Sequence, residues 1–272
     1  MTERAMPARR RPRRFWHAGP ALLAGGVLIL IFLAAILAPA VAPHDPYDQD
    51  IVGRNLLPPG FLKAARPSYV LGTDALGRDL LSRIMFGARV SLLVGTVAVA
   101  VSGTLGVTLG LVSGYYGGRP DRLLMRLAEV QLSFPFIQLA ISVIAVQGAG
   151  LRNIILVLGV TGWVTYARIV RGTVLTVKTL DFVTAAKALG APDRRIIVRH
   201  ILPNVLGSVA VIATFSFAQM ILAEAGLSFL GLGVQPPSPT WGGFLAEGRL
   251  YLAYAWWLTA FPGLAFMLTV LS

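Results

Sequence analysis

Long apolar stretches alternate with polar segments that are rich in arginine or proline. Six of these stretches approach or exceed the roughly 20 residues that a helix needs to cross a hydrocarbon core of about 30 Å. They cover residues 19–41, 90–115, 123–146, 153–170, 205–230 and 250–272. The pattern predicts an all-α membrane protein with about six transmembrane helices. The fourth stretch is the shortest, because Arg152 and Arg168 flank it and must reach opposite interfaces.

Composition supports a lipid-exposed surface. Hydrophobic residues make up 56% of the 272 residues and charged residues 13%, whereas soluble domains carry about 25% charged residues. The formal net charge of +12 comes from basic residues dispersed between the apolar stretches. A nucleic-acid-binding protein would gather such residues on one soluble face, so we expect membrane lipid and no nucleic acid as a partner.

The basic residues also predict an orientation. With the N-terminus in the cytoplasm, most of the 24 Lys and Arg residues fall on that side, in the tail 1–18, around 119–126 and along 168–199. This is the distribution that the positive-inside rule describes. His44 then lies on the opposite side from His17 and His200, which excludes a shared metal site.

The N-terminus allows a second interpretation. Arg13, Arg14 and Phe15 precede an apolar stretch that contains Ala38, Pro39 and Ala40, as in a twin-arginine signal with a cleavage site. The apolar core of such a signal is typically about 7–15 residues long. The core here runs from Ala18 to Val41, so we interpret it as an uncleaved first span.

We divide the chain into three parts: a basic cytoplasmic tail (1–18), a first span with an external segment (19–89), and a core transmembrane domain (90–272). The proline-rich residues 42–70 predict an irregular external loop. An amphipathic helix over 75–87, capped by Thr73 or Asp74, should follow it at the membrane interface. In the next span, Gly103, Gly106, Gly110 and Gly114 predict close approach of another helix.

Residues 178–204 predict a helix–turn–helix elbow, because the segment is too apolar for a free loop and too charged to cross the membrane. Asp181 can cap a helix over 182–189, and Gly190 can end it. Pro192 can open a second helix, which Leu202, Pro203 and Asn204 should break before the fifth span. The elbow is either a docking element or an interfacial connector without a partner.

The elbow resembles the cytoplasmic coupling loop of ABC importer permeases. That loop has the pattern Glu-Ala-Ala, three residues, Gly, and about nine residues later a hydrophobic residue followed by Leu-Pro. Ala185-Ala186, Gly190 and Ile201-Leu202-Pro203 match the pattern, and Thr184 stands where the family has Glu. Residues 71–92, 114–126, 132–136 and 221–242 resemble the dipeptide/oligopeptide/nickel branch, and its "C"-type subunit in particular.

The resemblance implies a type I importer permease in a bacterial inner membrane, forming half of a translocation pore. It implies three kinds of partner chain: a homologous "B"-type permease, two ATPase subunits that bind ATP and Mg, and a periplasmic or lipid-anchored substrate-binding protein. Because this chain has no phosphate-binding Gly-x-x-x-x-Gly-Lys-Ser/Thr loop, we expect no enzyme activity and no cofactor of its own. The expected coupling residues within loop 172–204 are Thr184, Ala185, Ala186, Gly190, Ala191, Pro192, Asp193, Arg194, Arg195 and Pro203.

Glu224 is the one acidic residue well inside a span. Buried carboxylates in membranes usually face a cavity or a partner, so Glu224 either faces the pathway and supports gating, or bonds locally near Gly231 and Gly233 in reach of solvent. Gln138 and Gln219, with Gln131 and Gln147, either line a polar passage or bond across helices.

Two other classes compete with an ATP-driven permease. A secondary transporter would show internal repeats around a midplane site, and we detect none. A membrane enzyme would need clustered nucleophiles, acids or metal ligands within the spans. The substrate is left open among dipeptides, longer peptides and metal chelates. Relatives usually continue into a short polar tail, whereas this sequence stops at Ser272 in an apolar run, so we expect further residues in the full-length protein.

Overall fold

The computed structural model describes residues 18–62 and 66–272. The basic tail, the paired arginines and His17 lie outside the described residues. Helices form most of the described chain, together with one isolated β-bridge between Thr73 and Asp79. In order they are α1 (Ala18–Val41), α2 (Leu80–Tyr116), α3 (Gly118–Leu132), α4 (Phe136–Gln147), α5 (Leu151–Thr161), α6 (Trp163–Val177), α7 (Asp181–Ala188), α8 (Asp193–Arg195), the π-helical turn η2 (Ile196–Ile201), α9 (Leu202–Phe229), α10 (Trp241–Gly248), the 3₁₀ turn η3 (Arg249–Tyr251) and α11 (Trp257–Leu271).

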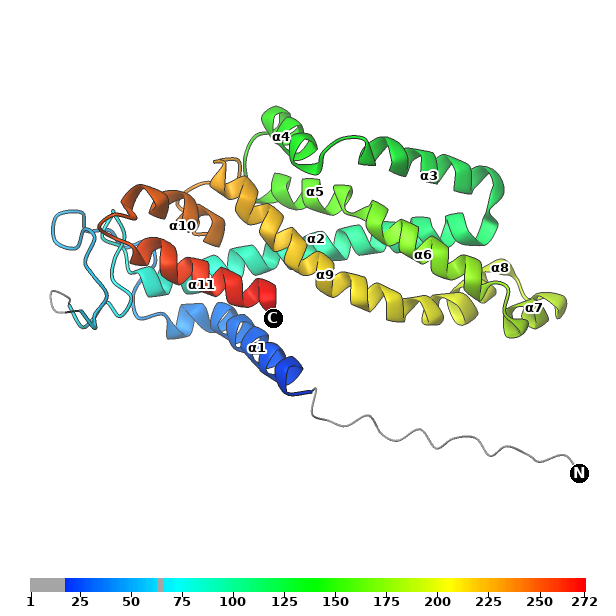
Figure 1. Ribbon diagram of the computed structural model, residues 1–272, viewed down its shortest axis with the longest axis horizontal. Coiled ribbons are helices and arrows are strands. Elements are labelled where there is room, and N and C mark those ends of the chain that lie inside the picture. Colours follow the sequence, from blue (N-terminus) through cyan, green and yellow to red (C-terminus); the bar gives the residue numbers. More distant parts are fainter. Residues whose placement is uncertain (1–17, 63–65) are drawn as a thin grey trace, which may run out of the picture.

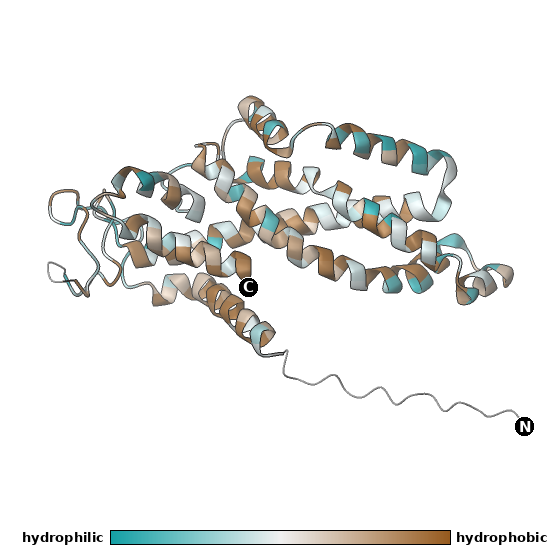
Figure 2. Cartoon of the chain, in the orientation of Figure 1, coloured by the Kyte–Doolittle hydropathy of each residue, from teal (hydrophilic) through white to brown (hydrophobic). Residues whose placement is uncertain are grey.

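The helices form an elongated bundle with two distinct ends (Figure 1). One end carries α7 and α8, and we call it the elbow end. The other carries the irregular segments 42–62 and 66–79 together with α10, and we call it the loop end. Hydrophobic residues follow α1, α9 and α11, whereas α3 alternates hydrophilic and hydrophobic positions (Figure 2). The two ends therefore lie on opposite sides of an apolar middle.

The predicted spans are only partly continuous helices. In the described part of the chain, four helical segments are long and apolar enough to cross a membrane: Gly19–Val41, Leu80–Tyr116, Leu151–Val177 and Asp193–Phe229. The stretch 123–146 is instead split into α3 and α4, which meet at 86°. Pro135 explains the break, because the residue before a proline is disfavoured in a helix. The last span is also shorter than predicted, since α11 begins at Trp257 after turns over 249–256.

The predicted helix over 75–87 is not a separate element. Asp74 accepts hydrogen bonds from the backbone N–H groups of Leu76 and Arg78, at 2.8 and 3.0 Å, and so holds a turn there. The helix begins at Leu80, with Asp79 as its N-cap accepting from the Ser82 N–H. It then runs 37 residues to Tyr116. The predicted cap at Thr73 or Asp74 is therefore wrong, because the N-cap is Asp79. The predicted interfacial helix is instead the first part of a span.

The glycines of α2 lie against α6, as their spacing predicted. A Cβ atom on Gly110 would lie 2.8 Å from the Ala167 carbonyl oxygen, and one on Gly114 would lie 2.7 Å from the Val174 Cβ. Real side chains do not fit at such distances, so these positions need glycine for close helix approach. The seam fixes α2 and α6 as the central pair of the bundle.

Charged residues at the loop end are buried rather than interfacial. Arg78 and Arg83 both pair with Asp74, the former through Nε at 2.7 Å, and all three side chains are buried. The Arg83 guanidinium also lies over the Phe244 ring of α10, 4.8 Å from its centroid. In the exposed part of the loop, the Gly53 N–H and Arg54 hold the pKa of the Asp50 carboxyl below its ordinary value. The predicted interfacial helix over 75–87 would have left Arg78 and Arg83 exposed, whereas both are buried.

Candidate functional site

The first half of the elbow ends in a sharp break at Gly190. Gly190 has φ of 78°, its N–H donates to the Lys187 carbonyl, and the Ala191 N–H donates to the Ala186 carbonyl. These bonds form the Schellman pattern, in which glycine takes the left-handed conformation. The predicted end of the first helix at Gly190 is confirmed. A Cβ atom here would meet nothing within 4 Å, so the conformation, and not a close approach, requires glycine.

Two predicted details of the elbow differ in the structure. Asp181 is the first residue of α7, and Leu180 occupies the cap position without a side-chain bond. Pro203 does not end the helix, because the π-helical turn η2 directly precedes it and such a local change of helix type accommodates a residue without an N–H donor. The turn η2 connects α8 to α9, so Asp193–Phe229 is one helical segment of 37 residues. The second half of the elbow is thus continuous with a membrane span.

The elbow has a buried inner face. Val183, Ile196 and Ile201 are buried in an apolar cluster with residues of α2, α6 and α9, among them Leu111 and Val174. Apolar burial of this kind contributes about 25 cal/mol per Å². The elbow is therefore attached to three long helices at once.

The outer face of the elbow is open. Leu189 is 87% exposed. Ala186 and Ala191 are partly buried. The other predicted coupling residues are exposed, and they are Thr184, Ala185, Gly190, Pro192, Asp193, Arg194, Arg195 and Pro203. The Thr184 hydroxyl donates to the Asp181 carbonyl at 2.9 Å, so this position presents no charge where the family pattern has Glu. A partner chain would meet a mixed apolar and basic surface.

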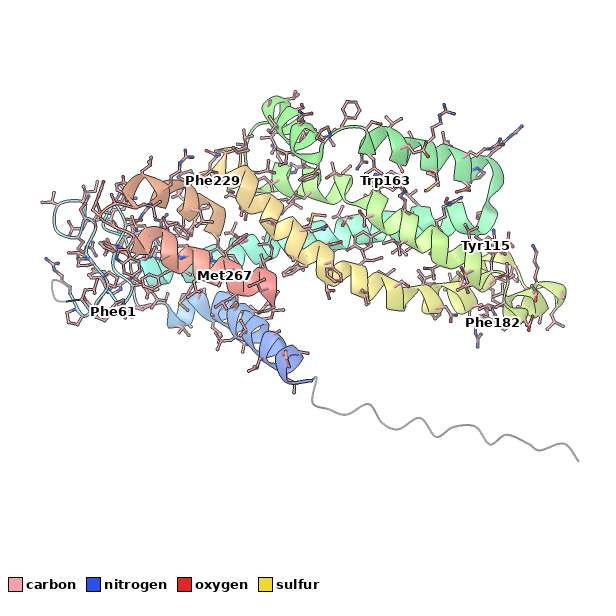
Figure 3. All side chains as sticks on the ribbon, in the orientation of Figure 1. Phe61, Tyr115, Trp163, Phe182, Phe229 and Met267 are labelled. Carbon is pink, nitrogen blue, oxygen red and sulfur yellow. The ribbon has the colours of Figure 1, made fainter. Side chains whose placement is uncertain are left out.

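Polar bonds tie the elbow end together, and sequence analysis missed all of them. Arg171 of α6 donates to both carboxylate oxygens of Asp121 in α3, at 2.5 and 2.7 Å. Lys178 Nζ donates to the Gly114 carbonyl at 2.8 Å. Tyr115 donates to Asp193 Oδ1 at 2.6 Å, and Figure 3 shows Tyr115 at this end of the bundle. These pairs are 50 to 78 residues apart in the sequence, so no local pattern signals them.

A cavity of about 600 Å³ lies where two helix irregularities meet α9. Its walls come from the α3–α4 bend, from the α5–α6 junction around Gly162, and from α9. The lining is mainly apolar and includes Gln131 and Gln219, but not Gln138. The Gln131 side chain accepts from Trp163 Nε1 at 2.8 Å and donates to the Thr161 carbonyl. Gln131 thus bonds across helices and also lines the cavity.

Glu224 is buried away from that cavity. Its side chain is fully buried and is absent from the cavity lining. Ser228 donates to Oε1 at 2.7 Å and Ser91 donates to Oε2 at 3.1 Å. The second alternative is wrong in placing Glu224 in reach of solvent. The local bonding that it predicted is present, and two serine hydroxyls of α2 and α9 supply it inside the bundle. The gating role stays a prediction.

Comparison with known proteins supports this fold. Residues 106–272 match the family described as binding-protein-dependent transport system inner membrane component. Residues 7–59 match the N-terminal transmembrane domain of oligopeptide transport permease C. The di/tripeptide transport system permease protein DppC of Pseudomonas aeruginosa is 42% identical over 96% of this chain and 87% of its own length.

Two further similarities are informative. The glutathione transport system permease protein GsiD of Pectobacterium atrosepticum is 39% identical over 96% of this chain and 84% of its own length. The inward-facing structure of the MetNI methionine ABC transporter superposes with a TM-score of 0.59 at 20% identity, covering 70% of this chain and 90% of that one. At that identity the match concerns the fold alone.

The bundle, its anchored elbow and its cavity define a multi-span membrane permease. The chain belongs to the family of binding-protein-dependent transport system inner membrane components, the permease subunits of ABC importers. The predicted family and all-α class are confirmed.

Proposed function

We propose that this subunit imports short peptides or a closely related small solute. We further propose that its elbow passes the conformational change of separate ATPase subunits to the membrane spans. The observation that carries the proposal is the elbow itself: a rigid break at Gly190, an inner face buried against three helices, and an exposed outer face over 184–195. Peptide import is supported by the names of the relatives, one a di/tripeptide and one a glutathione permease.

The elbow has the mechanical properties of a lever. Its second helix continues into α9, and its first follows α6 after a short turn. A force on the outer face would therefore move two spans, whereas a flexible loop would absorb it. Both α6 and α9 contribute to the cavity wall. Closure of two ATPase subunits on bound ATP and Mg would in this way change the cavity.

The other partners follow from the two ends of the bundle. We place the elbow end and the N-terminal tail in the cytoplasm, because both are Arg-rich segments. A substrate-binding protein delivers the solute at the loop end. A "B"-type permease covers the open side of the cavity, which is mainly apolar and includes exposed Phe134 and Ile137. Gln131 and Gln219 supply hydrogen-bonding groups to the pathway.

Co-expression with the partner subunits tests the proposal. The subunit purified alone should neither hydrolyse ATP nor transport, and both activities should appear in the assembled complex. Ala191→Cys in this cysteine-free chain should crosslink to an ATPase subunit, whereas the matched Asn55→Cys at the loop end should not. Crosslinking of Ala191→Cys only to the binding protein would overturn the assignment.

A further inference from the structure

A side-chain hydrogen bond joins the second helix of the elbow to the far end of α2. The hydroxyl of Tyr115, in the last turn of α2, donates to Asp193 Oδ1 at 2.6 Å. Asp193 is the first residue of α8, directly after the elbow break. A hydrogen bond to a carboxylate is short and directional, whereas apolar contacts are not directional. This bond therefore fixes the position of α8 relative to α2 more strictly than the surrounding apolar contacts do.

The bond lies beside a second turn of unusual conformation. Gly117 and Gly118 connect α2 to α3, and both have positive φ, 64° and 56°. A Cβ atom on either would meet nothing within 4 Å. The backbone conformation of the turn, and not a close neighbour, therefore favours glycine at both positions. The direction of α3 depends on this turn.

From that turn, α3 leads to the cavity. Asp121 near its start is held by Arg171 of α6 and by Ser113 of α2. Its last residues, Gln131 and Leu132, line the cavity. When α8 moves, its hydrogen bond to Tyr115 pulls on the α2–α3 turn. Movement of that turn shifts α3, whose last residues form part of the cavity wall.

We propose that Tyr115 is a positioning residue for coupling: through Asp193 it carries movement of the elbow to the α2–α3 turn and to the α3 part of the cavity wall. The inference rests on the proposed function, because it needs ATPase subunits that act on the elbow. It adds a third route to the two that follow α6 and α9.

The test is transport per ATP hydrolysed in the assembled complex in vesicles. Tyr115→Phe removes the donor and keeps the ring, and it should lower this ratio about fivefold, the equilibrium factor for the net contribution of one hydrogen bond. The adjacent Tyr116→Phe is the matched control, because Tyr116 is exposed and has a ring of the same kind. It should leave the ratio unchanged.

A double-mutant cycle separates this role from general destabilisation. Asp193→Ala should lower the ratio at least as much as Tyr115→Phe, and the double variant should be no worse than Asp193→Ala alone. Additive losses, or an unchanged ratio in Tyr115→Phe with the ATPase subunits still bound, would overturn the inference. Failure of the parent chain to bind any ATPase subunit would instead overturn the proposed function.

Discussion

Glu224 in α9 accepts a hydrogen bond from Ser91 in α2, at 3.1 Å between Oε2 and Oγ, across 133 residues of sequence. Its other oxygen accepts from Ser228, one turn further along α9. The Trp241 N–H at the start of α10 points to the same Ser91 oxygen, at 3.5 Å. One carboxylate therefore links α2, α9 and α10 inside the bundle.

We predict that Glu224→Gln is nearly silent and that Glu224→Leu is damaging. The amide oxygen of Gln can still accept from a serine hydroxyl. Leu leaves the hydroxyls of Ser91 and Ser228 without this acceptor, at a cost of about 1–3 kcal/mol for each buried group left unsatisfied. Thermal unfolding of the purified subunit in detergent measures the difference. Normal stability with altered transport in Glu224→Gln would instead indicate gating.

The α2–α6 seam should not tolerate a larger residue. Gly110→Leu would place its side chain against the Ala167 carbonyl and Val170, and overpacking of this kind costs about 1–3 kcal/mol or more. Gly207→Leu in α9 is the control, because a Cβ atom there meets nothing within 4 Å. Yield and thermal stability of the isolated subunit should fall for Gly110→Leu only. Equal stability of the two variants would contradict the packing account.

The sequence predicted features whose cause is local. Glycine spacing in α2 indicated close approach of another helix, and Gly190 indicated the end of the first elbow helix. Both features depend on a few neighbouring residues. Apolar length identified the spans, because a membrane imposes its thickness on each segment separately.

Features that depend on tertiary contacts were missed. Pro203 was predicted to break the helix, because nothing in the sequence shows that the helix continues from η2 into α9. The segment that contains Arg78 and Arg83 was predicted to lie at the membrane interface. The partners of these side chains, Asp74 and the Phe244 ring, contact them only in the folded chain. The links of Asp121 to Arg171 and of Tyr115 to Asp193 are invisible for the same reason.

The two ends of the bundle should react from opposite sides of the membrane. Asn55 is exposed at the loop end, and Leu189 is 87% exposed at the elbow. Single cysteines at these positions should label with an impermeant thiol reagent from the outside and from the inside, respectively. The cysteine-free parent chain gives the background. Labelling of both from the same side would contradict the orientation.

The basic residues of the elbow should act on the ATPase subunits through charge. Arg194 and Arg195 are exposed on α8, so Arg194→Glu and Arg195→Glu reverse the charge without disturbing packing. Binding of the ATPase subunits should weaken, and more strongly at low salt, because ions screen exposed charges. Co-purification at two salt concentrations measures this. A loss that does not depend on salt would point to a structural effect.

The central claim is that a rigid elbow couples ATP hydrolysis to transport. The most direct test measures transport per ATP hydrolysed in vesicles for Gly190→Val and Gly190→Asn. Neither side chain would meet an atom within 4 Å at its Cβ, so the variants differ chiefly in how well they accept φ of 78°. Asparagine tolerates that conformation, whereas a β-branched residue is strained in it. The account predicts that Gly190→Asn stays close to the parent ratio, and that Gly190→Val inserts normally but hydrolyses ATP with little transport or releases the ATPase subunits. Normal transport per ATP in Gly190→Val would contradict it.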